Sequence, residues 1–346
     1  MLRHNNSYDG YVVNNYLHIH QYTGVVCTLH KFAFCVLRSL VFGKFDKMWK
    51  NLCYKFSLIS LLLCVPSSMQ ISLDEFLTLT RSQKVALDEF RSAVSSKLPH
   101  QYMREDVYLI RWLREQNFNV SGATNRILKD IQWREDNDID NILKEDWADF
   151  DREFRVHIEG CDKSGRPILS IPVGDWDLRR AVVAGQSNRL MRYFSKLFEE
   201  GFTMARKFQE NGQNATQGTI IFDMGNFNLI QQGCLRCIPI FFHILSVYEQ
   251  HYPYFAHWVV SVNTPEFALP IYDIFKGILS KHVNEVLHIF GRNKRKWQNF
   301  LLEEIDESQL TKNLGGTNFE ALDYADFRGM DVSSYTCADM ELLRHH

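Results

Sequence analysis

The sequence lacks the short motifs with which many enzymes hold a phosphate, a metal ion or a nucleophile. It contains no GxSxG elbow, no GxGxxG or GxxxxGKS/T phosphate loop and no HExxH pair. Its 13 histidines are scattered along the chain. We therefore expect no catalytic residue, no cofactor and no metal site. An α/β hydrolase-like enzyme is the weakest alternative, because no nucleophile has a plausible base.

Strong charge and long apolar runs are scarce as well. The 346 residues carry a formal net charge of -2, whereas a general nucleic-acid binder is usually basic, so we expect no nucleic-acid partner. The apolar run at residues 56–65 is shorter than the ~20 residues that a membrane-spanning helix needs. Phenylalanine is abundant, with 25 residues, which indicates a large core or an apolar ligand pocket.

Residues 1–70 do not predict a folded domain. Basic residues precede the apolar run and Pro66-Ser67-Ser68 follows it, so residues 48–68 have the order of a secretory signal. A signal stands at the N-terminus, so this interpretation requires translation to start at Met48 and predicts a secreted protein. The alternative is an apolar segment that docks on the domain or at an interface, in a cytoplasmic protein with transient membrane contact.

The eight cysteines do not identify the compartment. Cys234 and Cys237 form a CxxC pair, but no second pair and no set of histidines stands near it in the sequence, so the pair does not indicate zinc. The spacing is typical of two small apolar residues on one face of a helix, and this is the interpretation that we prefer.

Residues 72–145 have a helical pattern. Ser72 is placed to cap a first helix, residues 83–96 and 106–116 predict two more, and Ser121 is placed to cap a fourth. Apolar residues recur every three or four positions, and charged residues occupy the other faces. The sequence therefore predicts a small all-helical lobe.

The pattern changes after residue 145. Apolar runs predict strands at 168–173, 219–224, 258–262 and 286–290, and amphipathic runs between them predict helices at 186–208 and at 233–250, the second bent at Pro239. Alternating strands and helices imply crossover units and a mainly parallel sheet. We therefore predict an α/β lobe over residues 150–316, followed by a tail, 317–346, of weak periodicity.

The helix predicted at 267–279 is apolar on almost every side. Only Pro270, Asp273, Lys276 and Gly277 interrupt its apolar residues. A short surface helix normally keeps a polar face, so this one is either deep in a core or a movable cover over an apolar space. Pro270 and Gly277 weaken a helix, which favours a lid over an apolar cavity.

The order of these parts resembles the CRAL-TRIO lipid-binding family, which includes retinaldehyde- and tocopherol-binding and phosphatidylinositol-transfer-like proteins. The matching stretches are residues 106–114, 162–167, 220–223, 252–253, 262–265 and 314–316. The resemblance covers residues 75–316. It implies a small all-helical N-terminal lobe, then an α/β lobe whose mainly parallel sheet floors an apolar pocket under a gate helix, the segment 267–279.

The resemblance also implies which residues bind the ligand. Alternate strand residues share a face, so the floor is expected from Leu169, Ile171, Ile220, Phe222, Val259, Ser261, Leu287 and Ile289. The wall is expected from Phe194 and Phe198, and the roof from Tyr272 and Phe275. For any one of these residues the alternative is ordinary core packing.

A membrane surface is the expected transient partner. The residues expected to contact it are Phe267, Ile271 and Ile278 on the gate helix, and the basic cluster Arg292, Lys294, Arg295 and Lys296. The alternative for the basic cluster is a solvated loop.

The implied function is binding and transfer of a hydrophobic small molecule. Phosphoinositide-binding members place a Glu directly after Tyr-Pro and a Lys at the start of the last strand, where this chain has Tyr254 and Val286. Without that pair an inositol phosphate headgroup loses its charge-assisted hydrogen bonds. We therefore expect a hydrophobic lipid or isoprenoid-type ligand. The alternative is a lipid-responsive regulatory module that binds a small GTPase or another protein.

Overall fold

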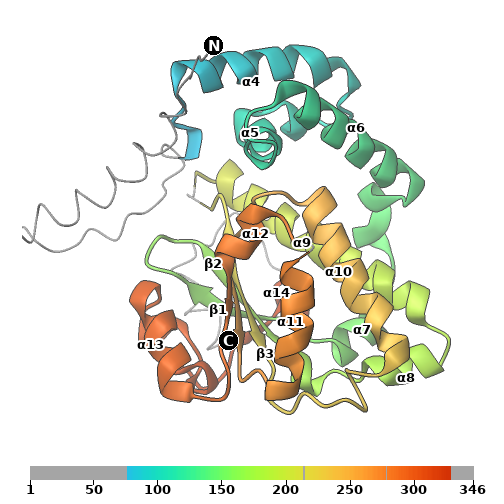
Figure 1. The fold of residues 1–346 in the computed structure, drawn as a ribbon, viewed down its shortest axis with the longest axis vertical. Coiled ribbons are helices and arrows are strands. Elements are labelled where there is room, and N and C mark those ends of the chain that lie inside the picture. Colours follow the sequence, from blue (N-terminus) through green and yellow to red (C-terminus); the bar gives the residue numbers. More distant parts are fainter. Residues whose placement is uncertain (1–75, 213–214, 278, 329–346) are drawn as a thin grey trace, which may run out of the picture. The chain divides into compact units, whose positions relative to one another are not determined.

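The computed structural model describes residues 76–212, 215–277 and 279–328 (Figure 1). The predicted segments 1–70 and 48–68, the cap at Ser72 and most of the tail 317–346 lie outside this part. The side chain of Ile271 lies outside it too. Within the described ranges, no helix combines the length and the apolar character needed to cross a bilayer.

In the described residues, the longer helices of the N-terminal lobe are α4 (Arg81–Val94), α5 (Asp106–Glu115) and α6 (Val120–Asp136). Thr80 begins α4 with a capping box, in which its hydroxyl accepts from the Gln83 amide at 3.3 Å and the Gln83 side chain accepts from the Thr80 amide at 2.9 Å. Asn119 caps α6 by accepting from the Gly122 amide at 3.0 Å, so the predicted cap at Ser121 is wrong by two residues.

A six-stranded sheet organises the rest of the chain. Its strands are β1 (His157–Cys161), β2 (Pro167–Pro172), β3 (Gly218–Asp223), β4 (Ala256–Val262), β5 (Leu287–Ile289) and β6 (Leu322–Asp323). Their order across the sheet is β5-β4-β3-β2-β1-β6. Strands β2 to β5 run parallel, and β1 is antiparallel to both β2 and β6. The predicted α/β class with a mainly parallel sheet is confirmed, and β6 carries the sheet into the predicted tail.

Helices cover both faces of this sheet (Figure 1). On one face lie α9 (Ser187–Glu210), α10 (Ile238–His251) and α11 (Leu269–Lys276), and on the other lies α13 (Lys294–Glu304). Shorter helices join them: α7 (Ala148–Glu153), α8 (Leu178–Val183), α12 (Lys281–Val286) and α14 (Tyr324–Phe327). Trp297 and Leu301 of α13 pack on Ile168, Ile221 and Val260, all fully buried.

Two prolines begin helices instead of bending them. Pro239 stands in the first turn of α10 and Pro270 in the first turn of α11, where the missing amide proton has no helical partner to lose. The predicted bend at Pro239 is therefore wrong, and Pro270 does not weaken α11. Gly277 caps the C-terminal end of α11, so the helix is shorter than predicted.

Buried polar contacts join the helical lobe to the α/β lobe. The Arg134 guanidinium of α6 donates to both oxygens of Glu199 on α9, at 2.9 and 2.8 Å, and the Tyr252 hydroxyl donates to Glu199 at 2.9 Å. Arg111 of α5 donates to the carbonyl of Tyr254 at 2.8 Å. Charge-assisted bidentate bonds of this kind fix orientation, so α9 has a defined position over the sheet.

Candidate ligand cavity and its covering helix

The sheet face under α9 and α10 carries the eight predicted floor residues in two rows. Register pairs Leu169 with Ile220, Ile220 with Val259 and Val259 with Leu287. The second row runs from Ile171 through Phe222 and Ser261 to Ile289. Since alternate strand residues share a face, the two rows form one continuous surface.

An apolar cavity of about 70 Å³ lies over the β2–β3 half of this surface. Six of the predicted site residues line it: Leu169, Ile171, Phe194, Phe198, Ile220 and Phe222. The other lining residues, which sequence reasoning missed, are Val156, Trp176, Leu197, Gly201, Ile244, Phe255 and Tyr324. No charged side chain is among them, so the cavity offers hydrocarbon and aromatic surface to a ligand.

Six of the 13 residues that line the cavity are aromatic. The Trp176 and Phe194 ring centroids lie 5.5 Å apart, and those of Phe198 and Tyr252 also lie 5.5 Å apart. At Gly201 of α9 a Cβ atom would stand 3.3 Å from the Phe255 ring, so a small residue lets this ring reach the wall. Rings at these distances pack favourably and stabilise the wall.

The remaining six predicted residues do not line this cavity. Val259, Leu287 and Ile289 are half-buried on β4 and β5, Ser261 is buried, and Tyr272 and Phe275 are half-buried on α11. They lie toward the other edge of the sheet, where α11 covers it. The structure thus brings the predicted set onto one face, but divides it between the cavity and the region of α11.

Two kinds of contact fasten α11. The Tyr272 hydroxyl and the Ser261 hydroxyl of β4 share a hydrogen bond of 3.0 Å, and Ser261 shares another of 2.9 Å with Thr264. Burial raises the pKa of Tyr272, so the phenol stays protonated and can donate. At the far end of α11, the Phe275 and Phe242 rings meet edge to face at 5.4 Å, which ties α11 to α10.

The segment after α11 is also attached to α10. The Ser280 amide, at the cap of α12, donates to the Glu249 carboxylate at 2.7 Å. The Tyr254 and His282 rings stack with centroids 3.7 Å apart and planes within 6°. Tyr254, directly after Tyr252-Pro253, therefore takes part in an aromatic stack. Val286, at the end of α12, is uncharged.

Near this stack, Glu115 has an altered pKa. Burial, reinforced by the Glu249 carboxylate, raises the pKa of Glu115 to about 7, while Arg126 acts in the opposite direction. A carboxyl with this pKa changes charge near neutral pH.

The residues predicted to contact a membrane are exposed where the structure describes them. Phe267 is 43% exposed. Arg292, Lys294, Arg295 and Lys296 are all exposed around the start of α13, where Asn293 provides the cap. The Thr264 amide donates to the Phe290 carbonyl at 3.0 Å, and the Phe290 amide donates to the Ser261 carbonyl at 2.8 Å, which brings this cluster to the same edge of the sheet as the start of α11. Ile278 and the Ile271 side chain lie outside the described residues.

The CxxC pair is not two residues on one helix face. Cys234 and Cys237 form a disulfide with a Cα–Cα distance of 5.1 Å, in the turn that precedes α10. The earlier interpretation is therefore wrong: the first turn of α10 begins only at Ile238. No cluster of three or more His, Cys, Asp or Glu side chains able to hold a metal occurs in the ranges that the structure describes.

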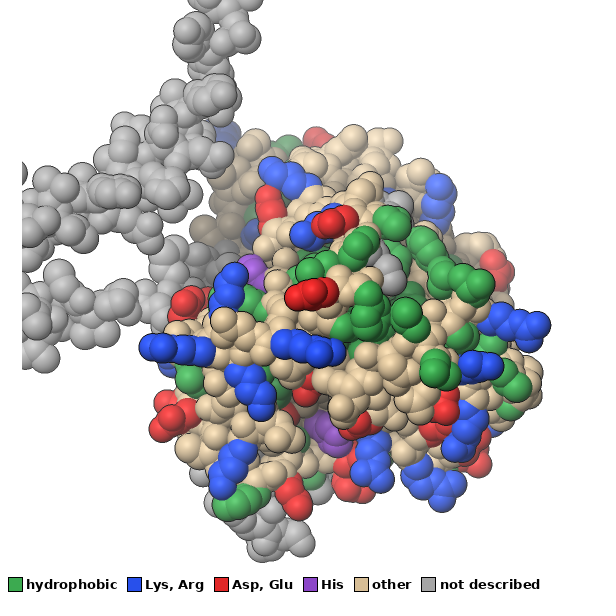
Figure 2. Space-filling model, turned by 60° about the horizontal axis from the view of Figure 1, so that its bottom comes forward, with side chains coloured by type: hydrophobic (Ala, Val, Ile, Leu, Met, Phe, Trp, Pro, Cys, Tyr) green, Lys and Arg blue, Asp and Glu red, His purple; other side chains and the backbone are tan. Residues whose placement is uncertain are grey.

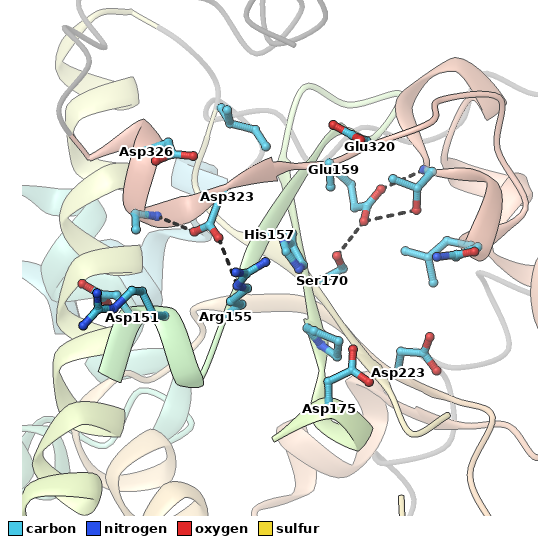
Figure 3. Close-up of a pocket in the computed structure, with 18 of the residues that line it drawn as sticks. Asp151, Arg155, His157, Glu159, Ser170, Asp175, Asp223, Glu320, Asp323 and Asp326 are labelled. Carbon is cyan, nitrogen blue, oxygen red and sulfur yellow. Dashed lines mark hydrogen bonds and ion pairs between the residues drawn. The ribbon is translucent and has the colours of Figure 1, made fainter. Parts of the chain in front are cut away.

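A larger groove, of about 1090 Å³, opens on the opposite face of the sheet beside β1 and β6 (Figure 3). Carboxylates point into it, among them Glu159, Asp223 and Asp323. Glu159 is buried and accepts from the Ser170 hydroxyl at 2.6 Å and the Thr311 amide at 2.8 Å. Placing hydrocarbon against these polar groups would cost their hydration, so the smaller apolar cavity is the better lipid site.

Comparison with known proteins agrees with this geometry. Residues 152–316, which contain β1 to β5 and α9 to α13, match the CRAL/TRIO domain. This stretch of the chain is a CRAL/TRIO domain. The chain is 24% identical over 196 residues to Protein ctg-1 of Caenorhabditis elegans, a match that covers 56% of this chain and 50% of that protein. It is 26% identical over 240 residues to Phosphatidylinositol/phosphatidylcholine transfer protein SFH4 of Arabidopsis thaliana, covering 67% of this chain and 38% of that protein.

A solved structure shares the fold of this chain. The crystal structure of Sfh5 is similar with a TM-score of 0.56 and 11% sequence identity, and the match covers 78% of this chain and 97% of that chain. At this identity the likeness shows the fold alone. The chain spans half the length or less of the two curated relatives named above.

Proposed function

We propose that this CRAL/TRIO protein binds a hydrophobic lipid or isoprenoid-type molecule in the apolar cavity and transfers it between membranes. The observation that carries the proposal is a cavity lined without charged side chains beside a short helix, α11, that few polar bonds hold down. We propose α11 as the gate. Binding in such a site needs no covalent chemistry.

The hydrophobic effect can supply the affinity. Burying a tail of ~10 methylenes contributes roughly 8 kcal/mol before ordering costs are subtracted. Small-molecule sites typically enclose ~300–1,000 Å³, whereas this cavity measures about 70 Å³. A lipid therefore enters only if α11 moves away from β4 and the rings of Phe194 and Phe198 turn aside.

The ligand we propose is neutral in its buried part. The name of the Arabidopsis relative assigns phosphatidylinositol and phosphatidylcholine to that protein. In this chain the residue after Tyr252-Pro253 is Tyr254, stacked on His282, and Val286 stands before β5. Neither residue can form an ion pair with an inositol phosphate headgroup. We place the protein in the cytoplasm with transient contact to membranes.

The alternative, a regulatory interaction module, gains little support from the described surface. An excess of exposed apolar side chains away from α11 would favour a protein partner. Outside α11, the turn before it, α10 and the loop between β3 and α10, the large exposed apolar side chains of the described residues are Val85, Val183 and Phe319. These three come from separate segments.

A pair of substitutions tests the proposal. We expect Phe275→Asp to abolish ligand retention, because the charge would replace the ring that meets Phe242. Val85→Asp is the matched control, since Val85 of α4 is 51% exposed and lies outside this region. Native mass spectrometry without membranes measures the bound ligand, and circular dichroism checks the fold. Equal ligand occupancy in both folded variants would refute the gate assignment.

A further inference from the structure

Most of the large apolar side chains exposed by the described residues lie on one edge of the molecule. We call this set the docking surface; its members are Leu229, Ile230, Leu235, Ile238, Phe242, Phe267, Leu269 and Ile274. The Phe227–Phe267 and Phe242–Phe275 ring contacts join the loop before α10, α10 itself and α11 into one surface. Figure 2 shows apolar side chains gathered there, with both basic and acidic side chains around them. A contiguous exposed apolar patch marks an interaction site.

The first protruding tip of this surface is rigid. The Asn228 side chain accepts from the amides of Ile230 at 3.0 Å and Gln231 at 2.9 Å, which folds the chain into a tight turn. Gln232 anchors the turn from below, because its buried side chain donates to the carbonyls of Gly174 at 3.1 Å and Trp176 at 2.6 Å. The turn therefore holds Leu229 and Ile230 at the surface.

The second tip is closed by the disulfide. Leu235 and Arg236 stand between Cys234 and Cys237, and the Cys237 amide donates to the Cys234 carbonyl at 2.7 Å. Cys237 is fully buried in the main core, whereas Leu235 is 84% exposed. The disulfide therefore links a buried anchor to an apolar side chain that points into solvent.

A lipid bilayer with anionic headgroups fits this surface. Apolar side chains that protrude from separate turns can each enter the acyl boundary, without the matched cavities that a folded partner would need. Arg236 at the second tip, Arg179 and Arg180 on α8 and Lys276 on α11 are exposed nearby and suit anionic headgroups. Glu266 and Asp273 are the exposed acids on the α11 segment.

We propose that Cys234 and Cys237 are a redox-controlled pair that sets the membrane affinity of the docking surface. The proposal rests on the proposed function, in which the protein visits membranes. In the oxidising step the two thiols lose two protons and two electrons and form the S–S bond, while one glutathione disulfide accepts them and becomes two glutathione molecules. Excess glutathione reverses the reaction.

The two redox states differ in how well the second tip is organised. With the disulfide closed, Leu235 is already held outward. In the dithiol state the Cys234 side is released from the buried Cys237, and the tip must be ordered when it enters the bilayer. Ordering one such side chain weakens binding by about threefold to tenfold, so the oxidised protein binds membranes more tightly.

The experiment compares vesicle binding of the full chain after equilibration with glutathione disulfide or with glutathione. Vesicles of phosphatidylcholine with phosphatidylserine are sedimented, and alkylation followed by peptide mass spectrometry reports the state of Cys234 and Cys237. We expect the oxidised protein to bind about threefold to tenfold more tightly. Equal binding of the two states, or a pair that stays dithiol in glutathione disulfide, would overturn the proposal.

Two variants separate this pair from the other cysteines. Cys234→Ser replaces a half-buried residue. We expect this variant to bind vesicles as weakly as the reduced protein does, whether it is equilibrated with glutathione disulfide or with glutathione. Leu235→Ser keeps the disulfide but removes the apolar tip, so it should bind weakly in both states. If vesicle binding by Cys234→Ser still depended on the redox state, other cysteines would cause the effect and the proposal would be refuted. Ligand occupancy without vesicles tests the cavity independently, so a failure of either proposal is recognisable.

Discussion

Removing the hydrogen bond between Tyr272 and Ser261 directly tests whether α11 acts as the gate. Tyr272→Phe removes the hydroxyl that shares a 3.0 Å bond with Ser261, and leaves the ring in place. Ser261 keeps its 2.9 Å bond to Thr264, so the substitution leaves no buried hydroxyl without a partner. The net loss is then that of one ordinary hydrogen bond, ~1 kcal/mol.

That loss acts on the closed state alone if α11 is the gate. A change of ~1 kcal/mol raises the open population by a factor of about 5. We expect a pyrene-labelled fatty acyl lipid to leave preloaded Tyr272→Phe about five times faster than it leaves the parent protein. Stopped-flow fluorescence with acceptor vesicles measures the rate.

A second tyrosine provides the matched control. The Tyr193 hydroxyl donates to Asp151 of α7 at 3.0 Å and to the Phe154 carbonyl at 3.2 Å, so its hydrogen bonds do not involve α11. Tyr193→Phe should lower the free energy of unfolding by a similar amount without changing lipid release. An unchanged release rate in Tyr272→Phe, or equal acceleration in both variants, would show that this bond does not hold the gate.

Three further predictions concern stability and the cavity. Arg134→Met leaves the buried Glu199 carboxylate unpaired and should lower the free energy of unfolding by ~3–5 kcal/mol in urea titrations, and the double variant with Glu199→Leu should recover most of the loss. Burial raises the pKa of Glu115 to about 7, so the folded state holds this proton more tightly than the unfolded chain; the stabilising contribution of Glu115 should be full below about pH 4.3, the unfolded pKa, and be lost as pH rises through about 7. Glu115→Gln should flatten that slope, and an unaltered slope would contradict the assignment. Ile220→Phe should fill the cavity, costing ~1–3 kcal/mol by overpacking and lowering ligand occupancy, whereas full occupancy would place the ligand elsewhere.

The sheet could be predicted because its signals are local. Apolar residues run through β2, β3 and β4, and the two-residue period fixes which side chains share a face. β1 was missed because its five residues include His157, Glu159 and Gly160, whose polar groups find partners only in the folded protein. β6 has two residues, and only its pairing with β1 makes it a strand.

The cavity could be predicted only in part, for a different reason. The floor follows from strand periodicity, but Trp176, Gly201 and Tyr324 reach the cavity through the path of the whole chain. Helix boundaries failed at Pro239 and Pro270 because proline is favourable in a first turn, and the sequence pattern alone does not locate that turn.

Several residues that carry the family resemblance are structural. Asp162 accepts from the amides of Ser164 at 2.8 Å and Arg166 at 3.0 Å and pairs with the Arg166 side chain at 2.6 Å, which builds the turn between β1 and β2. Arg111 joins the two lobes through the Tyr254 carbonyl. These residues identify the fold, whereas the identity of the ligand depends on the cavity wall.

Native mass spectrometry of the protein purified from its own cells, with extraction of the co-purifying molecules, tests the central claim most directly. We expect one hydrophobic lipid or isoprenoid-type molecule per chain, lost in Phe275→Asp and kept in Val85→Asp. A folded protein that is consistently empty, or that carries its ligand equally well in both variants, would contradict it.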